Sequence, residues 1–146
     1  MVDLAKGVPV NIHLETKVRQ NNDVEHFLFD LKGQVIRMGD TLYIRYKEEQ
    51  TDGKEAVSVT MKVFPDGSIQ LIRSGEMRLR LRFIYRQMYE TNYQTPYGVM
   101  FFSTYTKDLH FSLADRPTSG KVRIDYDLYM AKEKIGEYQI SLDFSA

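Results

Sequence analysis

Apolar and polar residues alternate with a period of two along most of this chain. The pattern is strictest over residues 77–83, where Met77, Leu79, Leu81 and Phe83 alternate with Arg78, Arg80 and Arg82. Side chains at i and i+2 of a β-strand point to the same face of the sheet. The segment therefore predicts a strand with one apolar face and one arginine face.

The same alternation recurs in about nine segments separated by turn residues, such as Pro65-Asp66-Gly67 and Thr51-Asp52-Gly53-Lys54. Long strands joined by short turns predict an all-β, antiparallel, up-and-down meander, and closing it into a barrel of about 8–9 strands would remove exposed edges. We expect residues 1–146 to form one domain. The expected strands are 8–20, 24–37, 41–49, 56–64, 68–74, 77–94, 97–113, 120–132 and 136–144.

One stretch also fits a helix. Its apolar residues have the spacing i, i+3, i+4, i+7 and i+8, which is typical of a helical face. We favour a strand, because the period of two is stricter just upstream and continues at Tyr93 and Thr95. The residues with helical spacing are Leu81, Ile84, Tyr85, Met88 and Tyr89.

The apolar sets predict which side of each strand faces the core. Each set occupies alternate positions of one expected strand, and the opposite face of that strand is mostly polar. The sets are Val8, Val10, Ile12, Leu14 and Val18; Leu42, Ile44 and Tyr46; Val57, Val59, Met61 and Val63; Val122, Ile124, Tyr126, Leu128 and Met130; and Tyr138, Ile140, Leu142 and Phe144.

Composition narrows the classes of function. Twenty basic residues balance twenty acidic ones, so net charge gives no general attraction to nucleic acids or membranes. The absence of cysteine excludes disulfides, thiolate catalysis and Cys-ligated zinc. No apolar run resembles a signal peptide or reaches membrane-spanning length, so we expect a soluble cytoplasmic protein.

No catalytic, cofactor or metal motif emerges. The arginine row could bind an anion, or it could be a solvated face that pairs with residues such as Glu48, Asp125 or Asp127, and we favour the second interpretation. The histidines His13, His26 and His110 are far apart in sequence, and we expect them on the surface. We assign no catalytic residue, no metal ligand and no cofactor.

The chain is rich in aromatic residues, with ten tyrosines and eight phenylalanines, and six of them lie within residues 89–105. Such residues can line a ligand cavity, which combines apolar walls with a few polar groups, or they can simply form core and cross-strand pairs. An eight-stranded barrel is just wide enough for side chains to fill it or for one small ligand.

Short motifs along the chain resemble the YwiB-like family of small proteins from Gram-positive bacteria. The resemblance covers most of the chain, and it implies a closed calycin-like (lipocalin-like) barrel without bringing an established activity. The motifs are Tyr43-Ile44-Arg45-Tyr46-Lys47-Glu48-Glu49, Ile72-Arg73-Ser74-Gly75, Arg82-Phe83, Gly98, Thr104-Tyr105-Thr106-Lys107 and Gly120-Lys121-Val122-Arg123-Ile124-Asp125-Tyr126.

The resemblance also marks a set of polar positions, whereas Arg78 and Arg80 match the family less well. We expect Arg73 and Arg82 to take an anionic group, with hydroxyl groups beside them. The full set of expected ligand-binding residues is Tyr46, Arg73, Arg82, Thr104, Thr106 and Tyr126.

Three functions stay open. We favour a non-enzymatic binding module that holds a small amphipathic or anionic molecule inside the barrel. The alternatives are a packed barrel whose outer surface docks onto a protein or RNA, and an enzyme with its site inside the barrel. The segment 99–105 is apolar on both faces, so the oligomeric state also stays open between monomer and homodimer.

Overall fold

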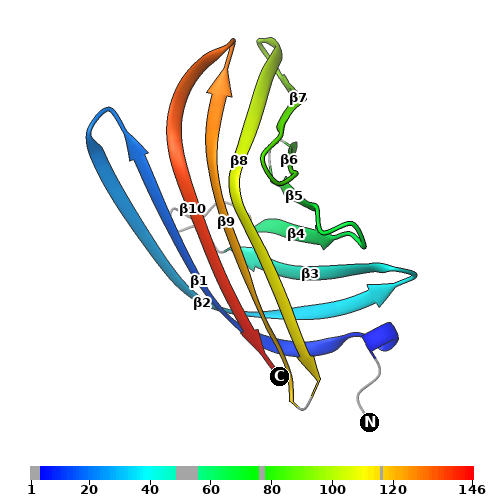
Figure 1. The fold of residues 1–146 in the computed structure, drawn as a ribbon. Coiled ribbons are helices and arrows are strands. Elements are labelled where there is room, and N and C mark those ends of the chain that lie inside the picture. Colours follow the sequence, from blue (N-terminus) through cyan, green and yellow to red (C-terminus); the bar gives the residue numbers. More distant parts are fainter. Residues whose placement is uncertain (1–3, 49–55, 76–77, 116) are drawn as a thin grey trace.

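A computed structural model describes residues 4–48, 56–75, 78–115 and 117–146 (Figure 1). Within these residues, ten strands form one sheet whose ladders are all antiparallel. The predicted all-β fold is confirmed. The elements are η1 (Leu4–Lys6), β1 (Val8–Gln20), β2 (Asp23–Met38), β3 (Thr41–Glu48), β4 (Val57–Val63), β5 (Ile69–Ser74), β6 (Arg78–Phe83), β7 (Met88–Thr95), β8 (Gly98–Asp115), β9 (Thr118–Met130) and β10 (Glu133–Ser145).

The observed strands match the predicted ones within a few residues, with one exception. The predicted strand 77–94 is two strands, β6 and β7, so the sheet has ten strands rather than 8–9. The predicted turn at 51–54 and the residue Met77 lie outside the described residues.

The break between β6 and β7 is a tight turn. Arg86 has a φ of +56°, in the left-handed region that non-glycine residues rarely adopt. The Gln87 N–H donates to the Ile84 carbonyl at 3.0 Å, which closes the turn. The helical alternative for this stretch is wrong, because the chain here is strand, turn and strand.

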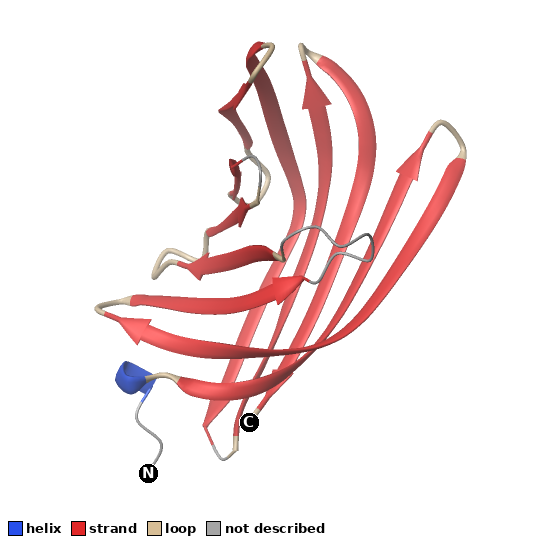
Figure 2. Cartoon of the chain, turned by 180° about the vertical axis from the view of Figure 1, so that it is seen from behind, coloured by secondary structure: helices blue, strands red, loops and turns tan. Residues whose placement is uncertain are grey.

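The strand order in the sheet is β6-β5-β4-β3-β2-β1-β10-β9-β8-β7. Each strand pairs with its neighbour in the chain except β6 and β7, and the two halves of the meander are joined where β1 pairs with β10. The sheet curls so far that β3 and β4 run across the direction of the steep strands β8–β10, as the two opposite views show (Figures 1 and 2). The result is a nearly closed barrel.

One end of the sheet, β6 with the turn at 84–87 that follows it, meets β8 at a seam that isolated hydrogen bonds hold together. The Arg86 N–H donates to the Thr106 carbonyl at 2.8 Å, and the Thr106 N–H donates to the Gln87 carbonyl at 3.3 Å. The Thr104 hydroxyl donates to the Arg82 carbonyl. A few local bonds therefore replace a full ladder at this point.

We call the end of the barrel at which the C-terminus lies its lower end (Figure 1). The core occupies the lower and central interior, as the apolar sets predict. Side chains from β1, β3, β4, β6, β9 and β10 converge there and form one buried cluster. The largest fully buried members include Ile12, Ile44, Met61, Phe83, Ile124 and Leu142.

Strand β2 belongs to two different regions. It pairs with β1 from Asp23 to Val35, and with β3 from Gly33 to Met38. A Cβ at Gly33 would collide with the Arg45 carbonyl and the Ile12 side chain, so the close approach of the strands there requires glycine. Beyond this point the β1–β2 hairpin diverges from β3 (Figure 1).

Among the described residues, none belongs to a helix of the length and apolarity that crossing a membrane requires.

We expect Phe83→Ala to lower the free energy of unfolding by about 3–5 kcal/mol, because the ring is fully buried and its removal leaves a cavity. Phe101→Ala is the matched control, since that side chain is 49% exposed on β8, and it should cost far less. Urea titration of both variants measures the difference. Equal losses would contradict the assignment of Phe83 to the core.

Candidate functional site

Arg73 lies on the inner face of the barrel. Cross-strand register places Tyr46 opposite Val59, and Val59 opposite Arg73, so these residues of β3, β4 and β5 share one face. Val59 and Tyr46 are buried members of the core, which identifies that face as the inner one. Arg73 therefore points to the inside, above the apolar cluster.

Glu48 is the direct partner of Arg73. Two contacts join the groups, Nη2 to Oε2 at 2.9 Å and Nη1 to Oε1 at 3.3 Å, so the guanidinium binds the carboxylate with both nitrogens. The Glu48 side chain is only 14% exposed, whereas that of Arg73 is 39% exposed. Glu48 follows Tyr46 by two residues, which puts both on the inner face.

Tyr126 approaches the same place from the opposite wall. Its ring lies 4.6 Å from that of Phe83 and stacks on Tyr138 at 5.1 Å. Burial raises the pKa values of Tyr46 and Tyr126 far above the ordinary range, and the positive charge of Arg73 opposes the shift for both hydroxyls. The structure thus brings Tyr46, Arg73 and Tyr126 together, although β3, β5 and β9 are separate in the chain.

Thr104 and Thr106 lie on the inner face of β8 beside the seam. Register places Thr106 opposite Tyr126, and both threonines are buried. The Thr104 hydroxyl already donates a hydrogen bond to the Arg82 carbonyl. The fully buried Thr106 hydroxyl has no hydrogen-bond partner within the described part of the chain, and such a group costs about 1–3 kcal/mol. It can accept a partner that is not part of the protein.

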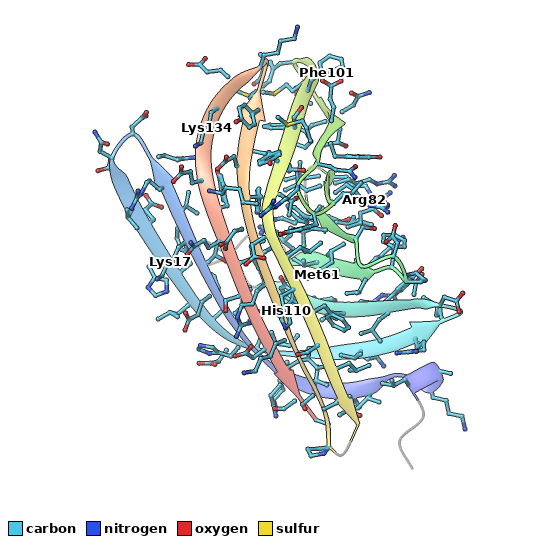
Figure 3. The ribbon with its side chains drawn as sticks, viewed as in Figure 1. Lys17, Met61, Arg82, Phe101, His110 and Lys134 are labelled. Carbon is cyan, nitrogen blue, oxygen red and sulfur yellow. The ribbon has the colours of Figure 1, made fainter. Side chains whose placement is uncertain are left out.

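Arg82 does not join this group. It alternates with the buried Leu81 and Phe83, so it lies on the outer face of β6 (Figure 3). Its Nη2 donates to the Ser68 hydroxyl at 2.8 Å, and its guanidinium lies 4.2 Å from the centre of the Phe64 ring. The expected cooperation of Arg73 and Arg82 at one anionic group therefore finds no support in the geometry.

The arginine row as a whole faces outward, with Arg78 and Arg80 exposed. Two of its suggested acidic partners are engaged elsewhere. Glu48 pairs with Arg73, and Asp127 lies 3.0 Å from Lys107 and 3.6 Å from Lys134.

Above Tyr46, Arg73 and Tyr126, the inner face carries aromatic side chains that are only partly buried. Register places Phe29 opposite the buried Leu14 and Phe27 opposite Thr16, so both rings share the inner face of the β1–β2 hairpin. They are nevertheless 37% and 42% exposed. From the other wall, Tyr93 and Phe102 pack with ring centres 5.7 Å apart. Side chains fill the lower interior of the barrel but leave aromatic surface uncovered above it.

Sequence reasoning missed several of these residues. Glu48 was considered only as a partner for the outer arginines, although its spacing of two from Tyr46 is a signal that the two share a face. Phe27 and Phe29 carried no signal, because residues 27–29 are apolar on both faces.

The histidines are on the surface, as predicted, but two of them come close together. His13 Nδ1 lies 2.8 Å from Asp30 Oδ1, and His13 Nε2 lies 3.0 Å from Glu15 Oε1. His26 lies 3.7 Å from the same Glu15 carboxylate. Over the described ranges, no group of three His, Cys, Asp or Glu side chains is placed to hold a metal ion.

Comparisons with known proteins agree with this architecture. Residues 12–142 match the model of a domain of unknown function, DUF1934. The chain is 25% identical over 131 residues to the uncharacterized beta-barrel protein YwiB of Bacillus subtilis, covering 90% of this chain and 89% of that protein. The crystal structure of the B. subtilis ywiB protein superposes with a TM-score of 0.81 at 20% identity, over 97% of this chain and 93% of that one. This likeness shows a shared fold.

Asp30→Asn should lower the pKa of His13. The hydrogen bond that His13 donates to Asp30, followed by the one that it donates to Glu15, holds this pKa above its ordinary value of about 6.5. Since the folded-state pKa is the higher one, the contribution to stability is full below about pH 6.5 and is lost as the pH rises through the folded value. NMR titration of the imidazole signals measures the pKa. Asp23→Asn on the same strand is the control, and an equal effect of both substitutions would contradict the assignment.

Proposed function

The chain belongs to the DUF1934 family of domains of unknown function, and from that premise we propose that it is a non-enzymatic binding module for a small amphipathic molecule with an anionic head. The ligand lies against the inner face of the upper half of the barrel. The observation that carries the proposal is the combination there of half-exposed aromatic side chains with the inward guanidinium of Arg73. Ligand sites commonly pair apolar walls with a few polar groups that fix orientation.

Arg73 is the group that receives the anionic head. Its bond to Glu48 holds the guanidinium in place and uses only part of its fork of N–H donors. The remaining donors and the exposed part of the side chain are available to a carboxylate, sulfonate or phosphate. A guanidinium binds such groups with two parallel hydrogen bonds, which gives direction as well as attraction.

The two tyrosine hydroxyls are suited to assist. A phenol is protonated at neutral pH, and burial raises the pKa values of Tyr46 and Tyr126 further, so both hydroxyls can serve as hydrogen-bond donors. Because the phenolate form is not populated at neutral pH, neither tyrosine is suited to act as a general base. Thr106 adds a buried hydroxyl whose hydrogen-bonding capacity is unused by the described residues.

The apolar part of the ligand contacts the aromatic residues of the hairpins. Phe27 and Phe29 lie on one wall, and Tyr93 and Phe102 on the other. Covering these rings removes apolar surface from water, which contributes about 25 cal/mol per Å². Arg82 takes no part, because it lies outside the barrel with Ser68 and Phe64.

The test uses two fluorescent probes, the anionic 1-anilinonaphthalene-8-sulfonate and the uncharged N-phenyl-1-naphthylamine. The variant Arg73→Met with Glu48→Met removes both charges of the pair and so leaves no buried carboxylate unpartnered. We expect it to weaken binding of the sulfonate by roughly 10- to 100-fold, because charge-assisted hydrogen bonds contribute about 1.5–3 kcal/mol. Binding of the uncharged probe should change little.

Arg78→Met is the matched control, since this arginine is exposed on the outer face. It should leave both affinities unchanged. If the outer and inner variants weaken the sulfonate equally, or if the double variant leaves it unaffected, Arg73 does not receive the anionic head. Thermal unfolding of each variant establishes that the barrel remains folded.

A further inference from the structure

The upper part of β2 is an apolar strand edge that lacks a second neighbour among the described residues. Residues 23–32 pair with β1 on one side, and pairing with β3 starts only at Gly33. Four apolar side chains are exposed there on both faces of the strand, namely Val24, Phe27, Leu28 and Phe29. A long apolar edge of this kind offers unpaired N–H and C=O groups to another strand.

The hairpin turn determines which backbone groups point to the free edge. Asn21 and Asn22 have φ values of 48° and 69°, the conformation of a two-residue type I′ turn, and they connect the paired residues Gln20 and Asp23. In such a hairpin the closing pair exchanges both of its hydrogen bonds, and hydrogen-bonded pairs then alternate along the ladder. The odd-numbered residues of β2 therefore face β1. The residues that face away are 24, 26, 28, 30 and 32.

We propose that this edge pairs with the same edge of a second copy of the chain, antiparallel and about a two-fold axis at Leu28. Leu28 is the middle of the five residues that face away from β1, so this register gives each of them a hydrogen-bonded partner. Residue 24 lies opposite residue 32 of the second copy, residue 26 opposite residue 30, and Leu28 opposite its own equivalent. Such an isologous contact closes on itself and does not propagate into a fibre.

The side chains fit this register. His26 lies opposite the second copy's Asp30 on the outer face, twice by symmetry, and Asp30 uses only its Oδ1 in the bond to His13. Phe27 lies opposite the second copy's Phe29 on the inner face, and such aromatic cross-strand pairs are favourable.

Other registers fit less well. An axis at Asp30 would place the two Asp30 carboxylates against each other, and an axis at Phe29 would place His26 against Lys32. An axis at His26 would leave Lys32 without a partner on the other strand. Charge complementarity therefore selects the pairing about Leu28.

A single cysteine tests the register, because the natural chain has no cysteine to compete. Under mild oxidation, Leu28→Cys should form a covalent dimer on a non-reducing gel, since directly opposite residues have Cα atoms about 5.5 Å apart. Val24→Cys is the control. It has the same exposure, but its equivalent in the second copy is displaced by eight residues along the strand, or about 26 Å. No cross-link at 28, or equal cross-linking at 24, would overturn the proposal.

Sedimentation velocity tests the association itself. The wild-type chain should sediment as a dimer and Leu28→Lys as a monomer, because two ammonium groups would then meet at the axis. Val99→Lys, at a similarly exposed apolar site on β8, should remain dimeric. A monomeric wild-type chain, or dissociation by Val99→Lys and not by Leu28→Lys, would overturn the proposal. Circular dichroism establishes that each variant is folded.

Discussion

The antiparallel pairing of β1 with β10 is the contact on which the rest of this fold depends. Every other ladder among the described strands joins neighbours in the chain, whereas this one joins the two ends of the meander. Its register places Ile12 opposite Phe144 and Leu14 opposite Leu142, all four of them in the buried cluster. Because the side-chain period is two, a slip of one residue would turn one strand's apolar set toward water. The core thus selects a single register.

The candidate site depends on the same pairing. Tyr46, Glu48 and Arg73 belong to the β1–β6 half of the meander, and Thr106 and Tyr126 belong to the β7–β10 half. Within one half, these residues could form only one wall. They face each other because β1 and β10 align the halves, and because the seam between β6 and β8 holds the far ends together.

Much of the fold could be predicted from the sequence, because alternation and turn residues act locally. The strand limits and the inward apolar sets follow from these signals. The turn at 84–87 could not be predicted, since it contains neither glycine nor proline and Arg86 adopts its left-handed conformation without a local signal. The face of Arg73 was equally hidden. In β5 both Leu71 and Ile72 are buried, so alternation does not reveal whether Arg73 points inward or outward. Only the register across β3, β4 and β5 decides it.

The location of the seam also bears on how the chain folds. Read from β7 to β10 and then from β1 to β6, the order of strands in the sheet is that of a simple meander. Asn11 pairs with Ser145, so the two ends of the chain lie near each other. A circular permutant that joins these ends and opens the chain within 84–87 would have only ladders between neighbouring strands. Its relative contact order would be lower, and we expect it to fold faster than the natural chain. In the natural order, the chain between β1 and β10 is the longest loop that a ladder closes. Its closure costs conformational entropy before the β1–β10 contacts form, so the joining of these strands carries the largest entropic barrier to folding.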